Sequence, residues 1–237
     1  AGNRSLIWPI CIVIGGNINL ISFEQQTHKA LMAYFRLLIG CIPEEKRFQF
    51  DRILGEIGLS LRDVHAGEIG KAVFADFKQV LYNTQDQIIP DIILSFSKTV
   101  RLSSLGILGY AIINSKNIEK ALQVSSRFSS LSYSNFDFQL FKNKDTAGIR
   151  LLDHLPSRLE REDFLCSKYN MLSSMLPPST DLSRMHIYAD YSLPSYETSY
   201  QWFFKCSIQF DASYLCIYFP AEWLKTTVNG ADHELYL

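Results

Sequence analysis

The chain has 237 residues, 47% hydrophobic and 20% charged, a balance that excludes a disordered polar chain and allows a sizeable core. Its formal net charge of -1 gives no overall attraction to nucleic acid or to an anionic membrane, and no local basic patch stands out. The five cysteines have apolar neighbours, which is typical of reduced core thiols in a cytoplasmic protein: Cys11, Cys41, Cys166, Cys206 and Cys216.

The longest uncharged run spans residues 5 to 23 and contains Pro9, two glycines and two asparagines. Its continuous apolar part is about half of the ~20 residues that a membrane-spanning helix needs, so we expect no membrane span. No small-residue cleavage pattern follows it cleanly, and we interpret the run as core-packing sequence rather than a signal peptide.

Apolar residues recur at helical spacing from residue 24 to 96. One helix covers residues 30 to 38, a second opens at Pro43 with two acidic residues in its first turn, and a third covers 69 to 82. Because the turns between these helices are short, we expect antiparallel neighbours in a compact helical subdomain.

The stretch 103–130 has the pattern of a helix, a polar break and a second helix. Gly106 and Gly109 have no side chain to hold a second backbone away, so we expect a close approach there. Asn117 is expected to cap the second helix, whose apolar residues continue to Phe128. The break is too short for a linker, which predicts a helical corner inside one domain.

In residues 131–237 the alternating pattern of strands and the 3.6-residue pattern of helices follow each other in the order ββ, α, β, α, ββ. The expected elements are a hairpin over 136–153, a helix over 160–175 stopped by Pro177, a strand over 184–191, a short helix capped by Ser195, and two strands, 206–210 and 214–219, around a tight turn. These predict an α+β fold in one domain, in which a mainly helical part (1–130) packs with a C-terminal antiparallel sheet flanked by helices (131–237).

Two stretches together resemble the N-terminal arabinose-binding-type domain of AraC-family transcription regulators. They are LGILGYAIINSKNIEKAL at 105–122 and MHIYADYSLPSYETSYQWFFKCSIQFDASYLCIYFPAEWL at 185–224. The family pattern is met at Pro194, Tyr200, Phe204, Phe210, Ala212, Ile217 and Leu224. The resemblance covers about Leu59 to Leu237. It departs at Lys120, where the family usually has a Glu, so we expect only half of a capping box there.

The resemblance implies an effector-sensing domain of a bacterial-type, cytoplasmic regulator that is a homodimer and not an enzyme. It implies a small-molecule effector as partner, and DNA contact only through a C-terminal helix-turn-helix domain that we expect to be absent from this chain. A stand-alone small-molecule enzyme and a purely structural dimerisation module stay as alternatives. The sequence identifies neither the effector nor whether the regulator activates or represses.

Catalytic signatures are absent from the sequence: there is no C-x-x-C, H-E-x-x-H, G-x-S-x-G or phosphate-binding glycine loop. The five histidines are dispersed, so we expect no catalytic residues, no metal and no cofactor. Asp153 and His154 are adjacent, but neighbouring residues of a strand point to opposite faces, which favours a loop end over a catalytic pair.

A small-molecule pocket is the remaining hypothesis. His186 and Tyr188, with Asp190, are spaced to share one side of a strand, and polar groups of this kind orient ligands in mostly apolar cavities. The candidate ligand-binding residues are Tyr133, Arg150, His186, Tyr188, Tyr196 and Trp202. A chain with 12 tyrosines also fills its sheet faces and helix seams without any ligand, so ordinary packing stays an alternative for each residue.

Overall fold

The computed structural model describes residues 12–14, 17–19, 36–66, 90–129, 136–152, 155 and 157–230. Residues 36–40 are helical, and the labelled helices are α2 (Glu44–Gly55), α3 (Leu61–Ala66), α5 (Ile92–Ser97), α6 (Ile107–Ile113), α7 (Ile118–Arg127), α8 (Arg158–Met175) and α9 (Glu197–Phe203), with 3-10 turns η1 (Leu102–Leu105), η3 (Leu182–Arg184) and η4 (Ala221–Lys225). The helix expected over 69–82 and the Asp153–His154 pair lie outside the described residues, as does Tyr133.

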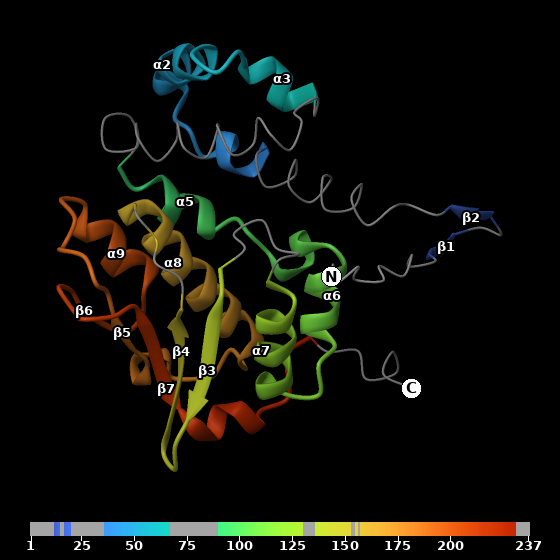
Figure 1. The fold of residues 1–237 in the computed structure, drawn as a ribbon, viewed down its shortest axis with the longest axis vertical. Coiled ribbons are helices and arrows are strands. Elements are labelled where there is room, and N and C mark those ends of the chain that lie inside the picture. The colour runs from blue at the N-terminus through green and yellow to red at the C-terminus, as the bar shows by residue number, and fades with distance from the viewer. Residues whose placement is uncertain are drawn as a thin grey trace, which may run out of the picture.

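A five-stranded sheet forms the centre of the second half (Figure 1). Its strands are β3 (Phe138–Lys142), β4 (Thr146–Leu151), β5 (His186–Tyr188), β6 (Ser207–Gln209) and β7 (Cys216–Pro220), in the order β3-β4-β7-β5-β6. All neighbours are antiparallel except β5 and β6, which are parallel. A separate two-stranded hairpin pairs β1 (Ile12–Ile14) with β2 (Asn17–Asn19). The α+β class is therefore confirmed, with a sheet that is mostly antiparallel.

The hairpin expected at 206–219 is wrong, because β5 lies between β6 and β7. The segment between these strands bonds to the chain that follows β5 instead: the Asp211 amide donates to the Tyr191 carbonyl and the Ala212 amide to the Ala189 carbonyl. The apolar β7 thereby takes a central position in the sheet, where Ile217 and Phe219 are buried. The prediction paired β6 with β7 because they are consecutive in the sequence. The position of a strand in the sheet depends instead on how much of it must be buried.

One row of aliphatic side chains crosses the whole sheet and faces the helices. Leu140, Ile149, Ile217, Ile187 and Ile208 stand opposite one another from β3 to β6. The three central isoleucines are at most 1% exposed, and burying a side chain of this size contributes about 1.5–3 kcal/mol. Helix α7 packs against β3 and α8 against β7, and in Figure 1 α8 runs behind the sheet.

The helical corner is confirmed, but its first helix begins later than expected. Gly106 has φ 60°, a conformation that favours glycine, and α6 starts only after it. A Cβ at Gly109 would lie 1.8 Å from the Leu102 carbonyl oxygen, so the close approach is made by the preceding turn. Asn117 caps α7 as predicted, since its Oδ1 accepts from the Lys120 amide at 2.9 Å.

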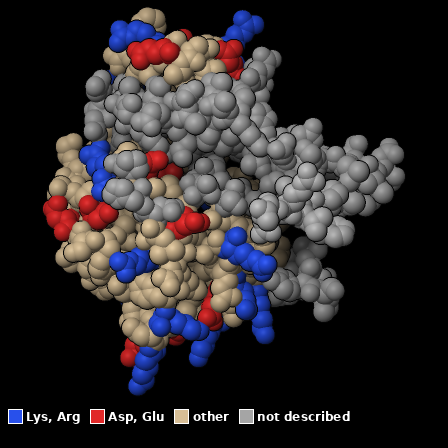
Figure 2. All heavy atoms as spheres, viewed as in Figure 1, with Lys and Arg blue, Asp and Glu red and all other residues tan. Residues whose placement is uncertain are grey.

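The corner contacts the C-terminal end of the described chain. The Ile118 amide, at the start of α7, donates to the Thr226 carbonyl at 3.0 Å, just after η4. Helix α7 of the corner therefore packs with η4, the turn that follows the last strand. None of the helices in the described ranges has the length and apolar character to cross a membrane. Figure 2 shows side chains of both charges at the end of the molecule where the β3–β4 hairpin turns.

Candidate functional site

An open cleft of about 630 Å3 lies between the first turns of α8 and the segment 190–195. This volume is in the range of small-molecule pockets. Among the described residues, its lining combines two guanidinium groups, one carboxylate, hydroxyls and apolar groups: Pro90, Arg158, Arg161, Asp190, Tyr191, Ser192, Leu193, Pro194 and Ser195.

The start of α8 sets the position of the two arginines. Ser157 caps the helix, because its Oγ accepts from the Glu160 amide at 3.1 Å and the Glu160 carboxylate accepts from the Ser157 amide at 3.4 Å. The helix therefore begins before the expected residue 160. Arg158 and Arg161 are three residues apart and so lie on one side of α8, where both line the cleft.

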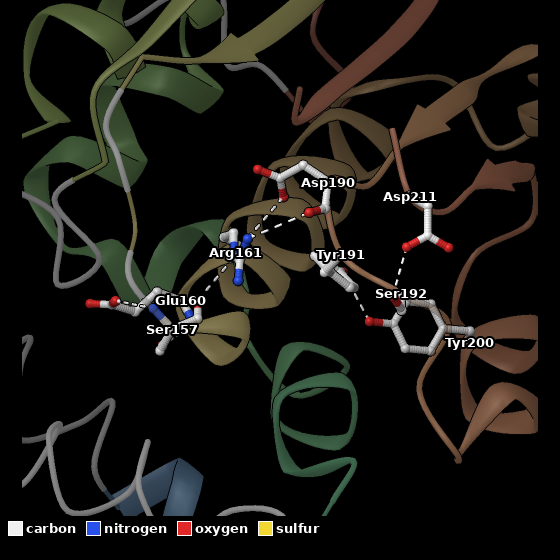
Figure 3. A network of polar contacts seen from close by, with 8 residues as sticks. All are labelled: Ser157, Glu160, Arg161, Asp190, Tyr191, Ser192, Tyr200 and Asp211. Carbon is white, nitrogen blue, oxygen red and sulfur yellow. Dashed lines mark hydrogen bonds and ion pairs between the residues drawn. The ribbon is translucent and has the colours of Figure 1, made fainter. Parts of the chain in front are cut away.

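Arg161 reaches across the cleft through long contacts (Figure 3). Its Nε donates to the Ser157 carbonyl at 3.3 Å, and its Nη1 donates to the Asp190 carbonyl at 3.5 Å. The Asp190 Oδ1 atom lies 3.7 Å from the same Nη1, and within the described chain this buried oxygen accepts no hydrogen bond. Close charge-assisted hydrogen bonds measure about 2.7–2.9 Å, so the pair is loosely held.

Two hydrogen bonds anchor the 190–195 segment on its other side. The buried Tyr191 hydroxyl lies 2.9 Å from the Tyr200 hydroxyl of α9, and the Ser192 hydroxyl donates to Asp211 at 2.6 Å. Figure 3 shows Arg161 and Asp190 on one side of Tyr191, with Tyr200 and Asp211 on the other. The wall of the cleft is thus linked both to α9 and to the end of β6.

Glu162 lies on the same helix as the arginines but is fully buried, with 0% of its surface exposed. It accepts hydrogen bonds from Tyr196, at 2.9 and 3.2 Å, and from Tyr200. Burial raises the pKa of this carboxyl from its ordinary value of 4.5 to about 7, while the two tyrosine hydroxyls and the Arg158 charge oppose the rise. A buried carboxyl with a raised pKa therefore joins α8 to Tyr196 and to Tyr200 of α9.

Helix α5 meets the same region from the helical half of the chain. Asp91, just before α5, accepts from the Ser199 hydroxyl of α9 at 2.7 Å, and α5 packs against both α8 and α9. The cleft therefore lies near the junction of the two halves of the sequence. Clefts between packed units are common places for ligands.

The predicted ligand-binding residues do not gather in this cleft. Arg150 and Tyr188 are both in register with Cys216, so they share the outer face of the sheet. There the Arg150 guanidinium lies 5.1 Å from the centre of the Tyr214 ring. His186 is on the same face, two residues before Tyr188 on β5, with its Nδ1 2.6 Å from the Ser207 hydroxyl.

The remaining candidates lie elsewhere. Tyr196 lies next to Ser195 of the cleft lining, and its hydroxyl donates to Glu162. Its ring centre lies 5.5 Å from the Arg158 guanidinium. Trp202 is 69% exposed on α9. The short helix that contains it begins after Tyr196, and Ser195 is not its cap, so that prediction is wrong. A ligand-binding role for the six candidates stays a prediction.

Sequence reasoning missed Arg158, Arg161, Glu162 and Tyr191. The acidic and basic residues at the start of α8 have the usual pattern of a solvated first turn, in which acids favour the positive helix end. One signal was present: Glu162 extends the buried stripe of Leu165 and Tyr169 backwards by one helical step. A carboxyl on that stripe must either find partners or lose its charge.

A second cavity, of about 40 Å3, lies between η1, α6 and α8 beside Lys168. Burial lowers the pKa of this lysine to about 8, and its Nζ lies 4.4 Å from the centre of the Phe138 ring. The space suits about one or two water molecules. Cys166 is buried in the core as expected, whereas Cys216 is buried on the outer face of the sheet and Cys41 and Cys206 are half-buried. In the described ranges no three His, Cys, Asp or Glu side chains are grouped to hold a metal ion.

Comparison with known sequences defines the class of protein. Residues 48–228 match the profile of the arabinose-binding domain of AraC transcription regulator, N-terminal, and the chain belongs to this family. It is 23% identical over 168 residues to an ornithine utilization regulator of Pseudomonas aeruginosa, an alignment covering 69% of this chain and 49% of that protein. The chain thus spans about half the length of this curated relative.

A solved structure supports the fold. The crystal structure of the transcriptional regulator CdpR from Pseudomonas aeruginosa superposes with a TM-score of 0.55 at 17% sequence identity. The superposition covers 78% of this chain and 59% of that one. At this identity the likeness concerns the fold alone.

Proposed function

We propose that this chain is the small-molecule-sensing domain of an AraC-type transcription regulator, and that its effector binds in the cleft between α8 and segment 190–195. The observation that carries the proposal is the cleft itself, which lies near the junction of α5, α8 and α9 in a domain of this family. The relative's name associates a similar protein with the regulation of ornithine utilization, which fits control by a metabolite.

The contacts around the cleft give a route for a response. An effector that draws Arg161 away from Asp190 frees the 190–192 segment to move, and that segment is bonded to Tyr200 of α9. Helix α9 is bonded in turn to Asp91 before α5. The effector changes the equilibrium between two packings only by its difference in affinity for them.

The complete regulator is proposed to act as a cytoplasmic homodimer that contacts DNA through a helix-turn-helix part outside residues 1–237. A regulatory rather than a catalytic role is favoured because the family and the reported relatives are named as transcription regulators. In this arrangement the effector domain alters DNA affinity through the coupling between two sites.

A thermal-shift screen of a metabolite library on this chain tests the proposal. An effector at about 100 times its Kd stabilises the folded state by about 2.7 kcal/mol, which gives a clear rise in Tm. The same compound must then change the affinity of the complete regulator for its operator. A purely structural module would give no shift with any compound, and turnover of a compound would favour an enzyme.

A further inference from the structure

We infer that the small cavity between η1, α6 and α8 binds a monovalent anion of about the size of chloride, held by the ammonium group of Lys168 and the hydroxyl of Ser125. This site is separate from the effector cleft, and the inference goes beyond the proposed function.

Lys168 is a buried cation without a close polar partner. The residue is 6% exposed, and within the described chain it makes neither a hydrogen bond nor an ion pair. Its contact with the Phe138 ring, 4.4 Å from Nζ to the ring centre, offers no oxygen to accept from the ammonium group. Burial lowers its pKa to about 8, so the amine still carries its proton at pH 7. A buried charge of this kind normally has a partner.

Asp163 acts on Lys168 without filling the cavity. It favours the charged form of the lysine, but less than burial disfavours that form. The two residues are five apart on α8, which is about 140° around the helix axis. Asp163 is not part of the described cavity lining, so its carboxylate does not occupy the space beside Lys168.

Ser125 of α7 supplies a second unused donor to the same cavity. It is 4% exposed, and its hydroxyl makes no hydrogen bond in the part of the chain that the structure describes. Other polar groups of the lining are already engaged. The Ser167 and Ser174 hydroxyls donate to carbonyls of α8, and the Asn170 amide group donates to two carbonyls at and after the end of α5, at 3.0 and 2.9 Å. Lys168 and Ser125 together therefore suit an occupant that accepts hydrogen bonds.

The size and the walls of the cavity favour a small anion. Its volume is about 40 Å3, and one water molecule takes about 30 Å3 of liquid, so a monatomic ion fits. Much of the described wall is apolar: Val100, Leu102, Leu105, Leu108 and Met171. In such surroundings water satisfies the hydrogen bonds of the ammonium group, whereas an anion also compensates its charge. The exposed Arg101 lines the same cavity and attracts anions from solvent.

Anion titrations of the whole chain at constant ionic strength test the inference. Sodium chloride, bromide or sulfate replaces sodium gluconate at pH 7 while the Tm is followed. We expect chloride and bromide to raise the Tm in a saturable way, because an ion bound to the folded state stabilises it. Sulfate is larger and divalent, and it should give no saturable rise.

Bromide then locates the ion, because its anomalous scattering distinguishes it from water. A crystal of the whole chain soaked in sodium bromide should show an anomalous peak within hydrogen-bond distance of Lys168 Nζ and Ser125 Oγ. Bromide peaks confined to the molecular surface or to lattice contacts would mean an adventitious ion only, and would overturn the inference.

Variants test the two donors. Lys168→Met keeps an apolar stem of similar length and should weaken chloride at least tenfold, and Ser125→Ala should weaken it by about tenfold. Lys120→Met is the matched control, because Lys120 is exposed on α7 and its Nζ donates to Gln123. Circular dichroism establishes that each variant folds, and the anion series and the bromide peak need no variant.

Three results contradict the inference. A cavity that holds water alone in bromide removes the ion. An equal rise in Tm with chloride, bromide and sulfate means a general salt effect. An unchanged chloride response in Lys168→Met places the ion elsewhere. None of these results bears on the effector cleft, so the proposed function is tested separately by its own screen.

Discussion

Replacing Glu162 by Gln should remove a pH dependence of stability that this carboxyl creates. Its folded-state pKa of about 7 lies above the ordinary value of 4.5, because burial disfavours the charged form. The stabilising contribution of the neutral form is therefore complete below pH 4.5 and is lost as the pH rises through 7. The difference between the two pKa values, at about 1.4 kcal/mol per pH unit, gives a loss of about 3 kcal/mol in the free energy of unfolding.

The side chain of Gln has the shape of the protonated carboxyl and cannot ionise. We therefore expect E162Q to have nearly the same free energy of unfolding as the original chain at pH 5. At pH 8 it should be more stable by about 2 to 3 kcal/mol. Urea unfolding at pH 5, 6, 7 and 8, with the slope m held common, measures this difference.

The matched control is Glu222→Gln, because Glu222 is an exposed carboxyl in a surface ion pair with Arg184. Its curve of stability against pH should follow that of the original chain within about 0.5 kcal/mol. Parallel curves for E162Q and the original chain would refute the reasoning, because another group would then cause the pH dependence. A loss of stability in E162Q at pH 5, with a curve that no longer falls towards pH 8, would mean that the amide disrupts the tyrosine contacts while Glu162 still causes the pH dependence.

Two further substitutions test the helical corner. Gly109→Ala should destabilise the chain by about 3 kcal/mol or more, because its Cβ would lie 1.8 Å from the backbone oxygen of Leu102. The control Gly55→Ala has no atom within 4 Å of the added methyl, and chemical denaturation should show a change of less than about 1 kcal/mol. Asn117→Ala removes the bond to the Lys120 amide and should cost about 1 kcal/mol, whereas an unchanged Tm would mean that water replaces this cap.

Local features of the fold were predictable because they depend on a few neighbouring residues. The cap at Asn117 and the tight hairpin before Gly148 follow from side-chain chemistry and turn composition alone. The end of α8 before Pro177 follows from the missing amide of proline. These signals need no knowledge of the tertiary packing.

The order of the strands was not predictable in the same way. Both Ser207–Gln209 and Cys216–Pro220 have strand patterns, and the short segment between them suggested a hairpin. The actual arrangement inserts β5, which pairs with both of them through Ile187. A choice between such pairings depends on long-range burial, which a local pattern does not contain.

The candidate site was only partly predictable for a related reason. Tyr188 and Arg150 were predicted to bind a ligand because of their residue type alone. The strand register places both on the outer face of the sheet. The arginines of the cleft stand at the start of α8, where charged residues usually face solvent, so the local pattern does not single them out. Their place in a cleft depends on the 190–195 segment, which comes about 30 residues later in the sequence.

The most direct test of the central claim is a crystal structure of this chain with the metabolite that raises its Tm most. We predict ligand density between the first two turns of α8 and segment 190–195, within hydrogen-bond distance of Arg161. Density on the outer face of the sheet at Arg150, or in the small cavity beside Lys168, would contradict it.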